Sequence, residues 1–213
     1  MGLGGAVRRR LGRWEIPAAD LYRSRFISLD DLATVLASVG PVKRIMEIGA
    51  GDGTLAQRIC AVFPDADYVG IDISPNPGRL FRGNPEQVKF LSMATYDYLA
   101  ANPGDTFDLV VIVDVLHHIP EQLRVPVLRD AATLTAPGGT IALKDWERGR
   151  GLWHLVAYSA DRYLSGDRDV RFPSLEELHS IVAEGLPEFG ITLEARIPPR
   201  RNNVLWTLRR WAD

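Results

Sequence analysis

The residues with the clearest chemical potential form a glycine-rich turn near position 50. Gly49, Gly51 and Gly53 alternate with other residues directly after Arg44–Ile48, which is expected to form a buried strand. Glycine tolerates the backbone of a sharp turn and lets a ligand approach the main chain closely. A helix that begins near Thr54 would add free N–H groups and a positive dipole end at the same place. The turn therefore predicts a site for a carboxylate or phosphate group.

Two carboxylates flank this turn. Glu47 precedes the first glycine by two residues, where it can face an ammonium group on a ligand. Asp72 follows the apolar run Tyr68–Ile71, where its carboxylate can accept hydrogen bonds from both ribose hydroxyls, or else form a turn or a helix cap. An NAD site would place a third glycine where Thr54 stands, and NAD has no ammonium group. The spacing favours S-adenosylmethionine (SAM).

Apolar runs that alternate with helical patterns are expected to position these groups. Strands are expected at Arg44–Ile48, Tyr68–Ile71, Val88–Leu91, Phe107–Val113 and Thr140–Leu143, and helices near residues 29–39, 54–63 and after Ser174. Two further runs, Ile191–Ile197 and Val204–Leu208, are joined by too short a link for a crossover helix, so they should pair antiparallel. This pattern predicts an α/β fold, namely a doubly wound, mostly parallel seven-stranded, Rossmann-like sheet that ends in an antiparallel hairpin.

Three segments in this order resemble the successive motifs of class I SAM-dependent methyltransferases. They are Arg44–Gly53, Tyr68–Asp72 and Phe107–Pro120. The resemblance implies SAM as cofactor, with the methionine part near the glycine turn and the ribose and adenine near Asp72. An Asp that the family often carries after the third strand is missing, so Met93 and Ala94 are expected to hold the adenine through their backbone. The implied donor-binding residues are Glu47, Gly49, Ala50, Gly51, Gly53, Asp72, Ile73, Met93, Ala94 and Asp114.

The fourth strand ends in a polar group of residues that should lie where acceptor and donor meet. His117 is the candidate general base, because the pKa of histidine lies near working pH; the alternative is a histidine that bonds to the backbone below the site. For His118 the structural role is preferred. Asp114, His117 and His118 also occupy positions similar to an acid, acid, histidine set of ubiquinone-pathway O-methyltransferases. A divalent metal is therefore the alternative to the metal-free site that we expect.

An acceptor-binding segment is expected to follow the fifth strand. Residues 146–173 are rich in aromatic and polar side chains, and they are interpreted as a cover over the acceptor, with ordinary helix packing as the alternative. The candidate acceptor residues are Lys144, Trp146, His154 and Tyr158.

Composition limits the remaining possibilities. The 213 residues fit a single domain, with residues 1–40 as a helical lead-in, and the net charge of −2 gives no general attraction to nucleic acid. A single cysteine is typical of a cytoplasmic protein, and no apolar run approaches the roughly 18 residues of a membrane span. We therefore expect neither a nucleic-acid nor a membrane partner, while the oligomeric state stays open.

The expected function is methyl transfer from SAM to a small-molecule acceptor, most readily at a hydroxyl oxygen. The alternatives are N- or C-methylation of a metabolite, a non-catalytic SAM-binding module, and an NAD-dependent oxidoreductase, which the glycine spacing disfavours.

Overall fold

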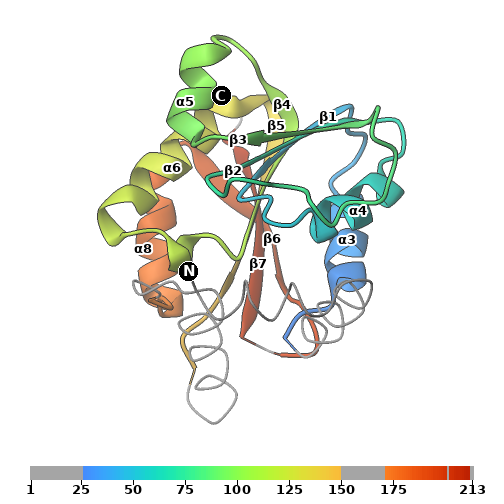
Figure 1. Cartoon of the computed structure of the whole chain (residues 1–213). Helices are drawn as coiled ribbons and strands as arrows, with labels where there is room; N and C mark the ends of the chain where they lie inside the picture. Colours follow the sequence, from blue (N-terminus) through green and yellow to red (C-terminus); the bar gives the residue numbers. More distant parts are fainter. Residues whose placement is uncertain (1–25, 150–170, 201, 212–213) are drawn as a thin grey trace.

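A seven-stranded sheet forms the centre of the molecule. The computed structural model describes residues 26–149, 171–200 and 202–211. The strands are β1 (Arg44–Ile48), β2 (Asp67–Asp72), β3 (Val88–Ser92), β4 (Phe107–Val113), β5 (Thr135–Trp146), β6 (Phe189–Arg196) and β7 (Asn203–Arg210). Their order across the sheet is β3-β2-β1-β4-β5-β7-β6 (Figure 1).

The sheet combines a parallel half with an antiparallel hairpin. β1 to β5 pair parallel to their neighbours, whereas β7 pairs antiparallel with both β5 and β6. The strand order reverses between β1 and β4, and such a reversal is where ligands bind in open α/β sheets, beyond the carboxyl ends of the strands. The expected α/β fold, a mostly parallel Rossmann-like sheet with a terminal antiparallel hairpin, is confirmed.

Helices cover both faces of the sheet (Figure 1). One face packs against α3 (Leu29–Ala37) and α4 (Thr54–Val62), and the other against α5 (Thr95–Ala101), α6 (Glu121–Leu134) and α8 (Leu175–Gly185). The alternating side chains of the buried strands divide between these two cores, as the period of two in a strand requires. Ser28 caps α3, and Ser174 forms a capping box with Glu177 on α8.

The start of one strand differs from expectation. β5 begins at Thr135 rather than Thr140, and its register with β4 steps from Phe107–Thr135 to Leu109–Thr140. Pro137, Gly138 and Gly139 therefore lie in an irregularity within the strand, where glycine accommodates the positive φ of 76° at Gly138. The connection from β2 to β3, residues 73–87, is a series of turns and contains no helix.

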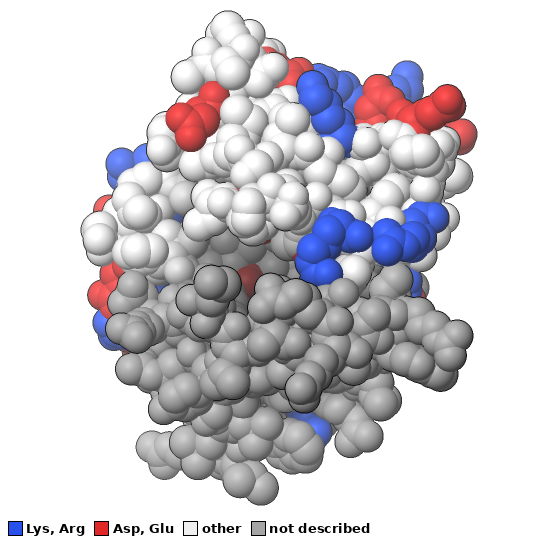
Figure 2. All heavy atoms as spheres, viewed as in Figure 1, with Lys and Arg blue, Asp and Glu red and all other residues white. Residues whose placement is uncertain are grey.

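Charge is distributed in small groups over the described part of the face in Figure 2, with uncharged surface between them. No helix within the described ranges is long and apolar enough to cross a membrane.

Candidate active site

The glycine turn connects β1 to α4 and folds over the ends of the central strands. Gly49, Gly51 and Gly53 have positive φ angles of 79°, 51° and 84° respectively. A Cβ on Gly49 would lie 2.3 Å from a methyl group of Val115, whereas one on Gly51 would meet nothing closer than 4.0 Å. The first glycine thus allows close packing against the β4 end. The space beside the second is open to a ligand, while its own N–H and carbonyl are bonded to Asp72 and to the Gly78 N–H.

The three glycines of the turn share one type of backbone conformation. All three lie in the left-handed region that favours glycine. The predicted turn is therefore present, and it places backbone N–H groups at the start of α4.

Asp72 lies at the end of β2, beside the glycine turn. Its carboxylate accepts hydrogen bonds from the backbone N–H of Gly51 at 2.8 Å and of Ser74 at 2.7 Å. The next side chain, Ile73, is 84% exposed, which is unusual for a large apolar residue. The structure thus brings together the carboxylate expected for the ribose and an exposed apolar surface suited to the adenine.

Glu47 is buried on the face of the sheet that α4 covers. The Tyr68 hydroxyl donates a hydrogen bond to its carboxyl group. Burial raises the pKa of Glu47 to about 8, although the hydrogen bond from Tyr68 acts in the opposite direction. Glu47 is therefore a buried carboxyl group near the end of β1, just before the glycine turn, with a pKa well above its ordinary value.

Met93 and Ala94 follow β3 on the same edge of the sheet. The Met93 N–H donates to the Asp72 carbonyl at 3.0 Å, and Ala94 is the N-cap residue of α5. Their backbone is therefore next to Asp72, as the adenine assignment requires, and that assignment stays a prediction.

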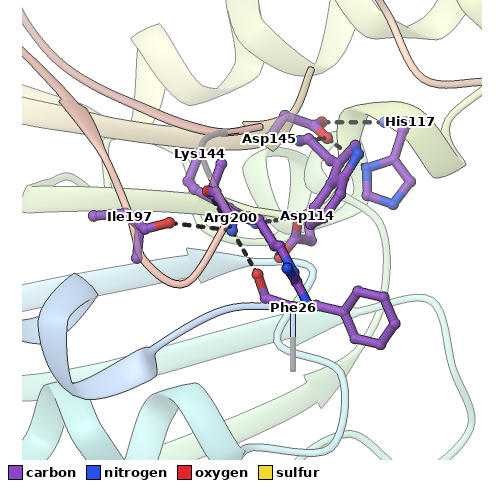
Figure 3. Close-up of polar contacts among 9 residues, drawn as sticks. Phe26, Asp114, His117, Lys144, Asp145, Ile197 and Arg200 are labelled. Atoms are coloured by element: carbon purple, nitrogen blue, oxygen red, sulfur yellow. Dashed lines mark hydrogen bonds and ion pairs between the residues drawn. The ribbon is translucent and has the colours of Figure 1, made fainter. Parts of the chain in front are cut away.

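Asp114 and Lys144 form an ion pair between the ends of β4 and β5 (Figure 3). The Lys144 Nζ lies 2.6 and 2.7 Å from the two carboxylate oxygens of Asp114. Only 1% of the Lys144 side chain is exposed, compared with 36% for Asp114. Asp114 also has a positive φ of 56°, a conformation that aspartate tolerates better than most residues. One expected donor-binding residue and one expected acceptor residue thus contact each other directly.

His117 lies in a 3-10 turn, Leu116–His118, directly after β4. Its ring Nδ1 lies 2.5 Å from Oδ1 of Asp145 at the end of β5, and both side chains are buried (Figure 3). Burial acts to raise the pKa of Asp145, but His117, Lys144 and the Trp146 N–H outweigh it and hold the pKa below its usual value. An ionised Asp145 can only accept, so Nδ1 carries the proton and Nε2 is the basic ring atom.

Aromatic rings surround this histidine. The Phe172 ring centroid lies 4.7 Å from that of His117, and the His118 ring lies 4.1 Å away on the same turn. Trp146 and Phe172 are buried together, with Phe26 packed against them. His118 therefore packs against the candidate base, and the structural role preferred for it stays a prediction.

The structure brings most of the expected site residues to one edge of the sheet. His154 and Tyr158, and most of the expected cover at residues 146–173, lie outside the described residues. Sequence reasoning missed Asp145, although a carboxylate at the end of the fifth strand was a usable signal. The metal alternative also changes, because the described residues that group as possible ligands are Asp114, His117 and Asp145 rather than His118.

Comparison with known proteins agrees with this geometry. Residues 46–141 match the model of a methyltransferase domain. The chain is 35% identical over 107 residues to Methyltransferase str2 of Strobilurus tenacellus, covering 50% of this chain and 37% of that protein. It is 28% identical over 149 residues to the ubiquinone biosynthesis O-methyltransferase of Xanthomonas campestris pv. campestris (strain B100), covering 68% and 59%. The chain thus spans less than two thirds of the length of either relative.

Solved structures share the fold at low sequence identity. The mitomycin 7-O-methyltransferase MmcR has a TM-score of 0.70 at 17% identity, covering 95% of this chain and 57% of that one. The N-methyltransferase NodS from Bradyrhizobium japonicum WM9 has a TM-score of 0.60 at 14% identity, covering 85% and 93%. Residues 46–141 thus match a methyltransferase domain, and the strand order and the glycine turn are similar to those of class I SAM-dependent methyltransferases.

Proposed function

We propose that this chain transfers a methyl group from SAM to a hydroxyl oxygen of a small-molecule acceptor, with His117 as the general base. The observation that carries the proposal is the buried His117–Asp145 pair, whose Nδ1–Oδ1 distance is 2.5 Å, at the strand ends beside the glycine turn. A base held by a carboxylate at the expected meeting point of donor and acceptor suits removal of a proton from a hydroxyl group.

The residues around the glycine turn fit the donor. The open space beside Gly51 and the helix N-terminus suit the methionine carboxylate, and Glu47 suits the methionine ammonium group. Asp72 suits the ribose, while the exposed Ile73 offers an apolar surface to the adenine. When bound, SAM supplies a methyl group on a positively charged sulfur.

Asp145 and His117 would divide the work at the acceptor. Asp145 fixes the tautomer of the imidazole and stabilises the positive charge that develops when His117 takes the proton. The buried rings of Trp146 and Phe172 limit the access of water to this pair. Orientation of the oxygen and removal of its proton are then the contributions of the protein, because attack on a sulfonium ion cancels charge rather than creating it.

The relatives support a methyltransferase but differ in the atom they methylate. The Xanthomonas relative and MmcR are named as O-methyltransferases, whereas NodS is named as an N-methyltransferase. The histidine–carboxylate pair favours oxygen here, because a neutral amine can attack without a base. N- or C-methylation and a non-catalytic SAM-binding module are the competing outcomes of the test. A cytoplasmic location stays a prediction.

The test combines an acceptor screen with three variants. Phenols, hydroxy acids and amines are incubated with SAM, and release of S-adenosylhomocysteine is measured. With a phenol of pKa about 10, His117→Ala should lower kcat about a hundredfold or more while SAM affinity, measured by calorimetry, stays near that of the wild type. Asp145→Asn should lower kcat in the same direction. His179→Ala, on the exposed surface of α8, is the matched control and should retain activity.

The pH profile separates a base from a structural histidine. In the wild type, kcat/KM should rise with pH as His117 loses its proton, and in His117→Ala the rate should follow the ionisation of the phenol instead. Full turnover of the phenol by His117→Ala at neutral pH would overturn the base assignment. SAM binding without turnover of any acceptor would favour the non-catalytic alternative.

A further inference from the structure

Three potential metal ligands lie close together at the ends of β4 and β5. One ligand atom each from Asp114, His117 and Asp145 lies within 4.8 Å of the others. Carboxylate and imidazole ligands are a set that Mn²⁺ and related divalent cations accept. The geometry alone would therefore permit a metal ion between the two strands.

A positive charge of the protein itself already occupies this group. Lys144 Nζ contacts both carboxylate oxygens of Asp114, at 2.6 and 2.7 Å, so a metal bound to either oxygen would lie beside the ammonium group and be repelled by its positive charge. The backbone reinforces the pair, because the Asp114 N–H donates to the Lys144 carbonyl at 2.9 Å. Because the Lys144 side chain is buried, moving its ammonium group away from Asp114 would leave a positive charge without a partner in the protein interior.

We propose that the Lys144 ammonium is the resident cation of the group formed by Asp114, His117 and Asp145, and that it excludes a divalent metal from this group. The inference rests on the ion pair and on the spacing of the ligands, and it holds whether or not the chain methylates an oxygen. Lys144 is accordingly a positioning residue, which orients and neutralises Asp114 and leaves His117 paired with Asp145.

Removal of the lysine should convert the group into a metal site. In Lys144→Met, the two carboxylates of Asp114 and Asp145 lose their neighbouring positive charge, and a cation relieves their repulsion. Mn²⁺ titrations followed by electron paramagnetic resonance should show one bound ion, at least about tenfold tighter than any binding to the wild type. Adding Asp114→Asn to this variant should abolish the new binding. Lys89→Met, on the exposed surface of β3, should behave like the wild type.

A second variant keeps the test decisive if Lys144→Met folds poorly. Lys144→Arg retains a positive charge and should bind no Mn²⁺, whereas Lys144→Gln retains length and polarity without charge and should bind it. Circular dichroism identifies the variants that are folded. Saturable Mn²⁺ binding by the wild type that Asp114→Asn removes would overturn the proposal, as would folded, uncharged variants that bind no more Mn²⁺ than the wild type does. Both results are independent of methyl transfer, so they also separate this inference from the proposed function.

Discussion

Burial distinguishes the two carboxyl groups that flank the glycine turn. Asp72 is partly exposed at a strand end, and two backbone N–H groups bond to it. Glu47 is buried one strand away, and the Tyr68 hydroxyl bonds to it. Because desolvation disfavours a charged carboxylate, Glu47 responds to pH in a range where an exposed carboxyl group is fully ionised.

We expect Glu47 to make stability depend on pH. The pKa of Glu47 rises from 4.5 to about 8 in the folded chain, so between these values the folded state keeps a proton that the unfolded state has lost. Stability is therefore lost as pH rises through this window, by up to about 1.4 kcal/mol for each pH unit. Glu47→Gln lacks this titration. Thermal unfolding at pH 5 to 8 should show the melting temperature of the wild type falling relative to that of the variant.

SAM binding offers a check on the same residue. An ammonium group placed near Glu47 would lower its pKa, so binding near pH 7 should release a proton. Calorimetry in buffers of different ionisation enthalpy measures this release, which Glu47→Gln should abolish. Parallel pH dependence of wild type and variant, together with no proton release, would contradict the assignment.

The residue scale also shows why the site was only partly predictable. The donor residues follow one another along short motifs, so their chemistry was visible in the sequence. The His117–Asp145 contact joins residues 28 positions apart, and it depends on the register of β4 with β5. Lys144 and Asp145 are adjacent and point to opposite faces of β5, so the sequence alone does not show which of them meets His117.

At the scale of elements, the steric contacts of the glycine turn lead to a prediction about SAM binding. A Cβ on Gly49 would clash with the Val115 side chain, whereas one on Gly53 would lie 2.8 Å from the backbone Cα of Gly78. Gly49→Ala and Gly53→Ala should both weaken SAM binding, since each also strains a positive φ. Adding Val115→Ala should partly restore affinity to Gly49→Ala and leave Gly53→Ala unchanged. Calorimetry on the four variants checks this, and equal restoration of both would contradict it.

Most elements were predictable because the apolar residues that become buried recur in the sequence with the period of the helix or strand that they form. The run Phe107–Val113 is apolar apart from Asp108, and it forms a central strand with those bounds. The predicted start of β5 was wrong because Pro137, Gly138 and Gly139 are typical of a turn, whereas the sheet accommodates them as an irregularity within the strand. A local turn signal does not report the pairing partner that keeps such residues in a strand.

At the scale of the whole molecule, Asn203 joins segments that are far apart in the sequence. Its Nδ2 donates to the carbonyls of Phe26 at 2.6 Å, Ile197 at 3.2 Å and Arg200 at 3.3 Å. Asn203→Ala would leave these carbonyls without that donor, and we expect a loss of about 2 to 4 kcal/mol in the free energy of unfolding. Denaturant unfolding measures the loss. Asn76→Ala, in the exposed loop after β2, is the control; equal stability of the two variants would contradict the role of Asn203.

The position of β7 between β5 and β6 has a consequence for biosynthesis. β7 is the last described strand to leave the ribosome, yet both of its neighbours precede it, and among the described strands β6 pairs with β7 alone (Figure 1). Until β7 has been synthesised, the nascent chain presents the unpaired edge of β5, and such edges can pair with strands of other chains. The sheet can be completed only after Arg210 has emerged, so chaperones that shield strand edges would act on this chain during its translation.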